Sequence, residues 1–263
     1  MADMTQAEFA ERMDERPVVL FPLGSQEVQG PQSQMGDFRL TERISELAAE
    51  RSGALVAPAL PFGYADFFRD FAGGIQLRPE TFVAVLTDML TSLLDHGLNR
   101  LLIVNGHTTN APLIAQVARR IRRSERVLIP SVDLWQALPD ALLEEIFEER
   151  NVRGHGGEPL TSIGLHLFPE NFRADLHRRK SDRVIRLGMR VRSVSGADFE
   201  GMRVNFPVDA GEVDRNGLLG GSALHASATR GNAMTEYLVA KIAKLATHLK
   251  AADPCLPEGE SPA

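Results

Sequence analysis

The sequence predicts an α/β protein, a three-layer α/β/α sandwich built around a mainly parallel sheet. Short apolar runs rich in Val, Ile and Leu alternate with longer amphipathic segments, and most of the runs end at Gly or Pro. The 263 residues are 43% hydrophobic and 24% charged, which suits a protein with a sizeable core. In such folds ligands bind beyond the carboxyl ends of the strands.

Four apolar runs are expected to form buried strands, at residues 17–23, 53–60, 99–106 and 126–134. Helical stripes lie between and after them, at residues 37–53, 82–93, 108–121, 139–150 and 238–249. The arginine-rich stretch at 176–196 indicates a strand or hairpin excursion from this pattern. We therefore expect a single domain over residues 1–250 and a flexible tail over residues 251–263.

Charge and cysteine content exclude several classes of partner and site. The net charge of −6 argues against nucleic acid and against an anionic membrane as a partner. The arginines at 119–126 end a predicted helix, where they suit the helix C-terminus better than a phosphate. Cys255 is the one cysteine, so there is no disulfide framework and no cysteine-based zinc site. With no signal peptide and no long apolar run, a cytoplasmic protein is expected.

Candidate metal ligands follow the predicted strands. Glu27 and Asp37 lie in the loop EVQGPQSQMGD after the first strand, and His107 lies in NGHTTN after the third. His155 and Glu158 lie in a later glycine-rich turn, HGGE. Each histidine alone can be structural, but imidazoles and carboxylates together suit zinc, manganese or iron. The loop after the second strand carries Tyr64, Phe67, Phe68 and Phe71, which would either wall a pocket or pack between subunits.

Several motifs in the same order resemble those of the creatininase family of metal-dependent amidohydrolases. FPLGSQEVQGPQSQMGD is similar to P-x-G-S-x-E-x-H-G-P-H-L-P-x-x-x-D, and FAGGIQL resembles F-P-G-T-I-S-L. NGHTTN resembles N-G-H-G-G-N, and HGGEPLTS resembles H-A-G-E-x-E-T-S. The late segment GLLGGSALHASATRG also looks like a family motif, G-x-x-G-D-P-x-x-A-x-x-x-x-G. The resemblance covers nearly the whole chain and implies the same fold.

The resemblance implies metal ligation by Glu27, Asp37 and His107, with Glu158 as a further ligand. Gln29 and Gln32 stand where the family pattern has histidine, Thr109 stands where some members have a further carboxylate, and Leu160 replaces a second glutamate. A neutral amide is a weak zinc ligand beside imidazole. We therefore expect about one tight divalent ion per chain, zinc first and manganese or iron as alternatives, with a weak or absent second site.

The family chemistry implies hydrolysis of a non-peptide, possibly cyclic, amide of a small molecule by metal-activated water. Glu158 would either ligate the metal or take a proton from that water, and the sequence leaves this choice open. His155 would protonate the leaving nitrogen or stabilise the oxyanion. Two alternatives remain: opening of an oxidised inositol ring at a C–C bond, and a metal-free, non-catalytic binding protein. A homo-oligomer is also expected from the resemblance, with a hexamer favoured.

Overall fold

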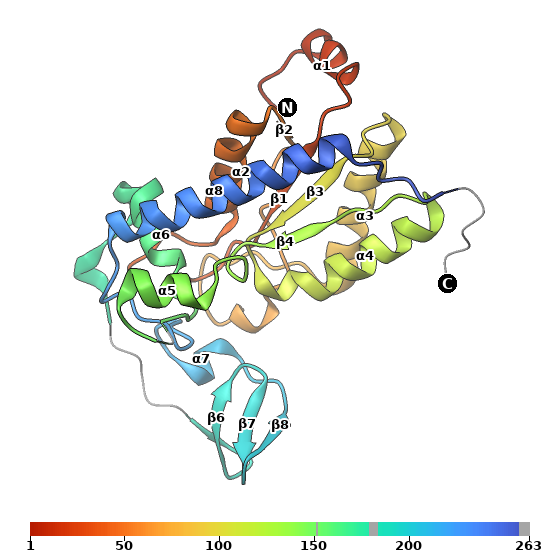
Figure 1. Ribbon diagram of the computed structural model, residues 1–263. Helices are drawn as coiled ribbons and strands as arrows, with labels where there is room; N and C mark the ends of the chain where they lie inside the picture. The colour runs from red at the N-terminus through yellow and green to blue at the C-terminus, as the bar shows by residue number, and fades with distance from the viewer. Residues whose placement is uncertain (151, 179–183, 258–263) are drawn as a thin grey trace.

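The computed structural model, which describes residues 1–150, 152–178 and 184–257, confirms the three-layer α/β/α architecture (Figure 1). Its central sheet has four parallel strands in the order β2-β1-β3-β4. The strands are β1 (Val19–Leu23), β2 (Leu55–Val56), β3 (Leu101–Asn105) and β4 (Ser131–Asp133). Helices α1 (Gln6–Met13), α2 (Phe38–Ser52), α3 (Pro79–Asp95), α4 (Ala111–Ser124), α5 (Asp140–Phe147), α6 (Leu160–Leu167) and α8 (Ala228–Ala251) accompany it.

Two of the strands are shorter than the sequence predicts. The run at 53–60 forms only the two-residue β2, and the run at 126–134 forms only β4. Prolines explain the difference, because a proline has no N–H to donate to a neighbouring strand. Pro58 lies two residues after the end of β2, and Pro130 immediately precedes β4. The expected helix at 108–121 begins with a 3-10 turn at Thr108–Asn110 before α4.

Both faces of the sheet are covered by helices. Leu20, Leu102 and Val104 pack with residues of α2, α6 and α8 in one core cluster. Val19 and Phe21 point to the opposite face, where they pack with residues of α3 and α4. β1 and β3 are consequently buried along their whole length, as is usual for parallel strands. Figure 1 shows α8 running across the sheet on the first of these faces.

The arginine-rich stretch belongs to a second, antiparallel sheet, which confirms the expected excursion. Its strands are β5 (Ile185–Arg186), β6 (Met189–Ser193), β7 (Gly196–Phe199) and β8 (Met202–Asn205), in sequence order. Residues 179–183 of that stretch lie outside the described residues. The sheet projects from the body of the molecule (Figure 1), and the short helix α7 (Ala210–Val213) at its base packs near Phe68. Ile185, Leu187 and Met202 are exposed on it.

The chain after α8 pairs with the start of the fourth apolar run. Leu128 N–H donates to Pro254 O at 2.9 Å, and Leu256 N–H donates to Arg126 O at 2.8 Å. This part of the expected tail therefore makes backbone hydrogen bonds, while residues 258–263 lie outside the described residues. None of the described helices is both long and apolar enough to cross a membrane.

The strand order places the topological switch point between β1 and β3. The chain leaves β1 for β2 on one side, and continues through β3 to β4 on the other. Leu23 at the end of β1 is in register with Asn105 at the end of β3. Loops that leave these two strands therefore start side by side, which is where ligands bind in open α/β sheets.

Candidate metal centre

Glycines allow the loops after β1 and β3 to approach each other closely. A Cβ on Gly24 would lie 2.3 Å from Oδ1 of Asp37, and a Cβ on Gly106 would lie 1.8 Å from Oγ1 of Thr41. Neither position can hold a side chain without displacing its neighbours. The turns in GSQE and NGH thus bring Glu27 and His107 against the start of α2.

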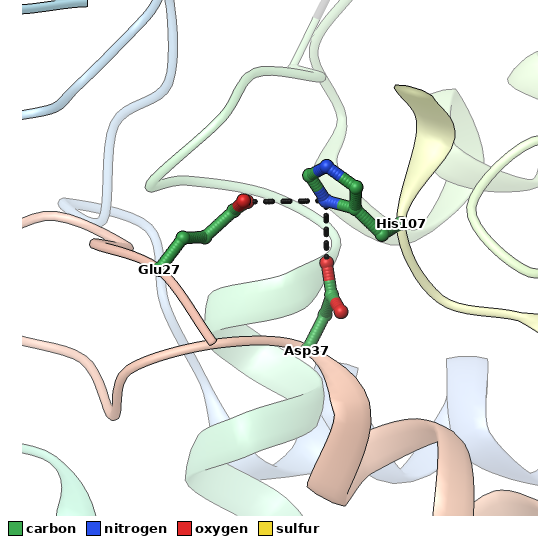
Figure 2. Close-up of side chains that lie close together, drawn as sticks. All are labelled: Glu27, Asp37 and His107. Atoms are coloured by element: carbon green, nitrogen blue, oxygen red, sulfur yellow. Dashed lines mark hydrogen bonds and ion pairs between the residues drawn. The ribbon is translucent and has the colours of Figure 1, made fainter. Parts of the chain in front are cut away.

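Glu27, Asp37 and His107 converge at this point, as the sequence predicts. Nδ1 of His107 lies 3.2 Å from Oε1 of Glu27 and 3.2 Å from Oδ2 of Asp37 (Figure 2). Among the described residues these three form the group whose potential ligand atoms all lie within 4.8 Å of one another. All three side chains are buried, with residue exposures of 0%, 2% and 5%.

The side chain of Asp37 does not cap the helix that it precedes. It occupies the N-cap of α2, yet its side chain makes no capping hydrogen bond. Oδ1 instead accepts the backbone N–H of Ser25 at 2.8 Å, which leaves Oδ2 facing His107. The hydroxyl of Ser25 lies 3.0 Å from Nδ1 of the same histidine. We did not predict a role for Ser25, although it directly follows Gly24 in the motif that led to Glu27.

The electrostatics of the cluster are those of a cation site. Burial raises the pKa of Asp37 to about 6, against the opposing effect of His107. For Glu27, burial acts in the same direction, but the nearby charge of His107 outweighs it and the pKa is lowered. Burial would lower the pKa of His107, yet Glu27 and Asp37 hold it well above its ordinary value. Two buried carboxylates thus favour a positive charge between them.

The two glutamines occupy different places. Gln29 Nε2 donates to Oε1 of Glu27 at 3.1 Å, whereas Gln32 Nε2 donates to the carbonyl of Gly156 at 3.0 Å. Oε2 of Glu27 and Oε1 of Gln29 are buried and have no hydrogen-bond partner in the protein. A buried carboxylate oxygen without a donor is rare unless an ion or water completes it. Two carboxylates and one imidazole therefore fit a divalent metal.

His155 lies beside this cluster in a defined orientation. Its ring stacks on Phe68 with centroids 4.4 Å apart, and Nε2 lies 2.7 Å from the carbonyl of Val28. Because a carbonyl only accepts, Nε2 carries the hydrogen, and Nδ1 presents its lone pair 3.7 Å from Oε1 of Glu27. Burial lowers the pKa of His155, so the ring is held neutral.

Glu158 shares the pocket but stands apart from the three-residue cluster. It precedes α6, and both of its oxygens are engaged by Ser162, with Oγ at 2.9 Å and the backbone N–H at 3.2 Å. Burial raises its pKa to about 7, while the hydrogen bonds from Ser162 act in the opposite direction. Glu158 is therefore a carboxyl that can gain or lose a proton near neutral pH.

One cavity of about 320 Å³ is lined by the three-residue cluster together with Gln29, His155 and Glu158. Phe67 and Phe68 form part of its wall, as expected for the aromatic loop, but Tyr64 and Phe71 do not reach it. Trp135 and Gln136 also line the cavity, and we did not predict them. The sequence could have indicated both residues, because they follow β4 at the edge of the sheet where the other strand-end loops lie. Arg153 holds the segment from Trp135 to Leu138 by donating hydrogen bonds to the carbonyls of both residues.

The comparison with protein families identifies the chain. The family model described as creatinine amidohydrolase, Creatininase, matches residues 2–246. The chain belongs to the creatininase family. The protein is thus a metal-dependent hydrolase, and the candidate metal site is the cluster of Glu27, Asp37 and His107.

Relatives within the creatininase family differ in what their names say they hydrolyse. A creatinine amidohydrolase from Pseudomonas putida is 29% identical over 242 residues, which cover 86% of this chain and 87% of that protein. A 3-dehydro-scyllo-inosose hydrolase from Thermotoga maritima is 25% identical over 178 residues, covering 64% of this chain and 55% of that protein.

Solved creatininase structures share the fold along nearly the whole chain. A structure described as creatininase Mn is 26% identical with a TM-score of 0.77, and covers 96% of this chain and 98% of its own. A mutant creatininase of Zn-Zn type has the same identity and coverage and a TM-score of 0.79.

Proposed function

We propose that this protein hydrolyses a non-peptide, possibly cyclic, amide C–N bond of a small molecule. The observation that carries the proposal is the arrangement around Glu27, where a three-ligand metal site and the neutral His155 face one cavity. The cavity volume lies at the lower end of the range for small-molecule sites. Similarity to creatinine amidohydrolase supports an amide as the bond cleaved.

Glu27, Asp37 and His107 would hold one divalent metal, which supplies a Lewis acid for the carbonyl and lowers the pKa of water. His155 is poised to accept a proton at Nδ1, because its Nε2–H is already donated to Val28. The same nitrogen can then pass that proton to the leaving nitrogen, so that one group serves as base and then as acid. In this mechanism His155 begins neutral.

Glu158 is proposed to act as a proton carrier rather than as a ligand of the first metal. Its oxygens are both engaged by Ser162, and it stands outside the three-residue cluster. A pKa of about 7 suits a carboxyl that exchanges protons during turnover. Ser162 directs the carboxyl by donating from both its backbone and its hydroxyl, so it is a positioning residue for Glu158.

The metal is proposed to be zinc, with manganese as the alternative, because the descriptions of solved creatininases name both a Zn-Zn and a Mn form. The ligand set, two carboxylates and one imidazole, accepts zinc, manganese or iron. Metal analysis of the purified protein by mass spectrometry decides between them.

A reconstitution screen tests the proposed function. Protein stripped with a chelator is reloaded with Zn²⁺, Mn²⁺ or Fe²⁺ and offered lactams, cyclic ureas and formamides. We expect hydrolysis of at least one of these amides, loss of that activity in His107→Ala, and no activity before reloading. Activity that survives complete metal removal and the His107→Ala change would contradict the proposal.

A second candidate is hydrolysis of a C–C bond in an oxidised inositol, as the name of the Thermotoga maritima relative suggests for that protein. Gln136 and Thr108 line the cavity and can hydrogen-bond hydroxyl groups. Keto-inositols therefore belong in the same screen. Ring opening of a keto-inositol with no turnover of any amide would favour this candidate over the first.

A further inference from the structure

The hydroxyl of Thr109 lies between His107 and the aromatic loop. Its Oγ1 is 2.5 Å from Nε2 of His107 and 2.6 Å from the carbonyl oxygen of Tyr64. The same Nε2 is 3.1 Å from that carbonyl. The three polar groups thus form a compact triangle on the side of the imidazole that faces away from Glu27 and Asp37.

Only one arrangement of hydrogens satisfies this triangle. The carbonyl of Tyr64 can only accept, and the hydroxyl of Thr109 has a single hydrogen. If that hydrogen pointed at His107, two oxygen lone pairs would face each other at 2.6 Å. The hydroxyl therefore donates to Tyr64 and accepts the Nε2–H of His107. With Nε2–H held by Thr109, Nδ1, the nitrogen between the two carboxylates, is the one that gives up its proton when a metal binds.

The backbone of Tyr64, whose carbonyl accepts from Thr109, is itself held in place. The backbone N–H of Tyr64 donates to Oδ1 of Asn110 at 2.9 Å, and Nδ2 of Asn110 donates to Gly24 O at 3.1 Å. Asn110 belongs to the same NGHTTN motif as His107 and Thr109. The motif therefore supplies the imidazole of His107, the hydroxyl of Thr109 that contacts it, and the amide of Asn110 that holds the backbone of Tyr64.

We propose that Thr109 is a positioning residue of the metal centre, which orients His107 and fixes the tautomer that presents Nδ1 to the metal. The proposal rests on the metal site of the proposed function and assigns Thr109 no ligand role. Outer hydrogen bonds of this kind hold the ring orientation and increase the basicity of the ligating nitrogen. The hydroxyl thus supports the first metal from a position where the family pattern can carry a carboxylate.

Matched variants separate the hydroxyl from the shape of the side chain. Thr109→Val keeps the branched shape and removes the hydroxyl, whereas Thr109→Ser keeps the hydroxyl. Thr87→Val is the control, because it removes a hydroxyl that donates to the Val83 carbonyl at 2.7 Å on α3, away from the site. The dissociation constant of Zn²⁺ is measured for each by competition with a chromophoric chelator.

We expect Thr109→Val to weaken Zn²⁺ binding by about 10- to 100-fold, the usual effect of losing an outer-shell partner. Thr109→Ser and Thr87→Val should bind as the wild type does. Long-range ¹H–¹⁵N spectra of the zinc-loaded wild type and Thr109→Ser should show His107 protonated at Nε2. Unfolding of the metal-free variants, followed by circular dichroism, shows whether each one is folded.

Three results would overturn the proposal. The first is an unchanged Zn²⁺ affinity in Thr109→Val, even where the metal-free variant is less stable, because that indicates a structural role only. The second is a Zn²⁺ affinity as weak in Thr109→Ser as in Thr109→Val, because the hydroxyl would then not be the group that acts. The third is zinc-loaded His107 protonated at Nδ1. A wild type that binds no metal would overturn the proposed function as well, whereas metal binding as expected without hydrolysis would overturn the proposed function alone.

Discussion

Gln29 faces Glu27 with the donor end of its amide, Nε2 lying 3.1 Å from Oε1 of the carboxylate. An ionised carboxylate only accepts hydrogen bonds, so the amide oxygen is turned away from Glu27 and is left without a partner. A ligand for a second cation would have to present that oxygen instead. We infer that this contact favours one metal ion at Glu27 and opposes a second.

This contact predicts about one tightly held metal ion per chain and an increase in Gln29→His. An imidazole at position 29 would supply a neutral lone pair beside Glu27, where the amide now supplies a donor. Elemental analysis after dialysis against a weak chelator measures the ratio of metal to protein. Gln32→His is the matched control, because Gln32 bonds to Gly156 rather than to the ligands, and it should leave the ratio unchanged. Two retained ions in the wild type would contradict the prediction.

Asp37→Asn should abolish tight metal binding while the chain still folds. The asparagine oxygen can keep the hydrogen bond from Ser25, so the change removes the charge that faces His107 and little else. We expect metal affinity to fall by more than about 100-fold, the upper end of what an outer-shell change costs. Asp133→Asn is the comparison, since Asp133 accepts from Asn105 and lies outside the cluster. Equal metal affinities in the two variants would rule out Asp37 as a ligand.

The edge of the sheet that carries the site follows from the sequence because parallel strands are recognisable as apolar runs. Once the runs ending at Leu23 and Asn105 are taken as parallel neighbours, the loops carrying Glu27 and His107 must start together. The three-residue cluster was thus within reach of sequence reasoning. The precise strand lengths were not, because Pro58 and Pro130 lie inside the predicted runs and limit the pairing there.

The hydrogen-bond partners of the site lay beyond sequence reasoning for a different reason. The hydroxyl beside His107 donates to the backbone carbonyl of Tyr64, and His155 donates to that of Val28. A backbone oxygen has no residue identity, so no pattern of letters marks it. The eight-residue helix α6 was also not predicted, because it directly follows the Gly-rich HGGE turn and Pro159. The roles of His155 and Glu158 consequently depend on the fold, and they remain predictions.

His155→Gln should lower kcat by about 100- to 10,000-fold without changing the metal content, as expected for loss of a general acid–base group. A glutamine amide can replace the hydrogen bond to Val28, but it cannot take up a proton. His225→Gln is the control, because the side chain of His225 is 58% exposed and lies outside the cavity. Steady-state kinetics on the substrate found by the reconstitution screen measures both variants. Full activity in His155→Gln would exclude the proposed proton transfer.

Glu158→Gln should increase the stability of the metal-free protein at alkaline pH. The folded-state pKa of Glu158 is raised from 4.5 to about 7, so the fold favours its neutral form. The stabilisation associated with this group is complete below its unfolded pKa and is lost as the pH rises through 7. Between pH 5 and pH 8 the free energy of unfolding should therefore shift in favour of the glutamine variant by about 2.5 kcal/mol.

Urea titrations of both proteins in a chelator at the two pH values measure this shift. Because a glutamine also loses one hydrogen bond with Ser162, only the change with pH is diagnostic, not the difference at one pH. Glu80→Gln serves as a comparison, since Glu80 lies in the first turn of α3, away from the cavity. A pH-independent difference between wild type and Glu158→Gln would show that Glu158 titrates as an ordinary surface carboxyl.

With a metal bound by these loops, the register between β1 and β3 would also tie the lifetime of the protein to the supply of metal. Glu27 and Asp37 come from the loop after β1 and His107 from the loop after β3, so the three meet only after these two strands have paired. An ion bound at that junction favours the native state over the unfolded state by an amount that grows with the free metal concentration. In metal-starved cells the chain would open more often and be degraded sooner. The abundance of the protein would then follow the availability of its metal, with no change in its synthesis.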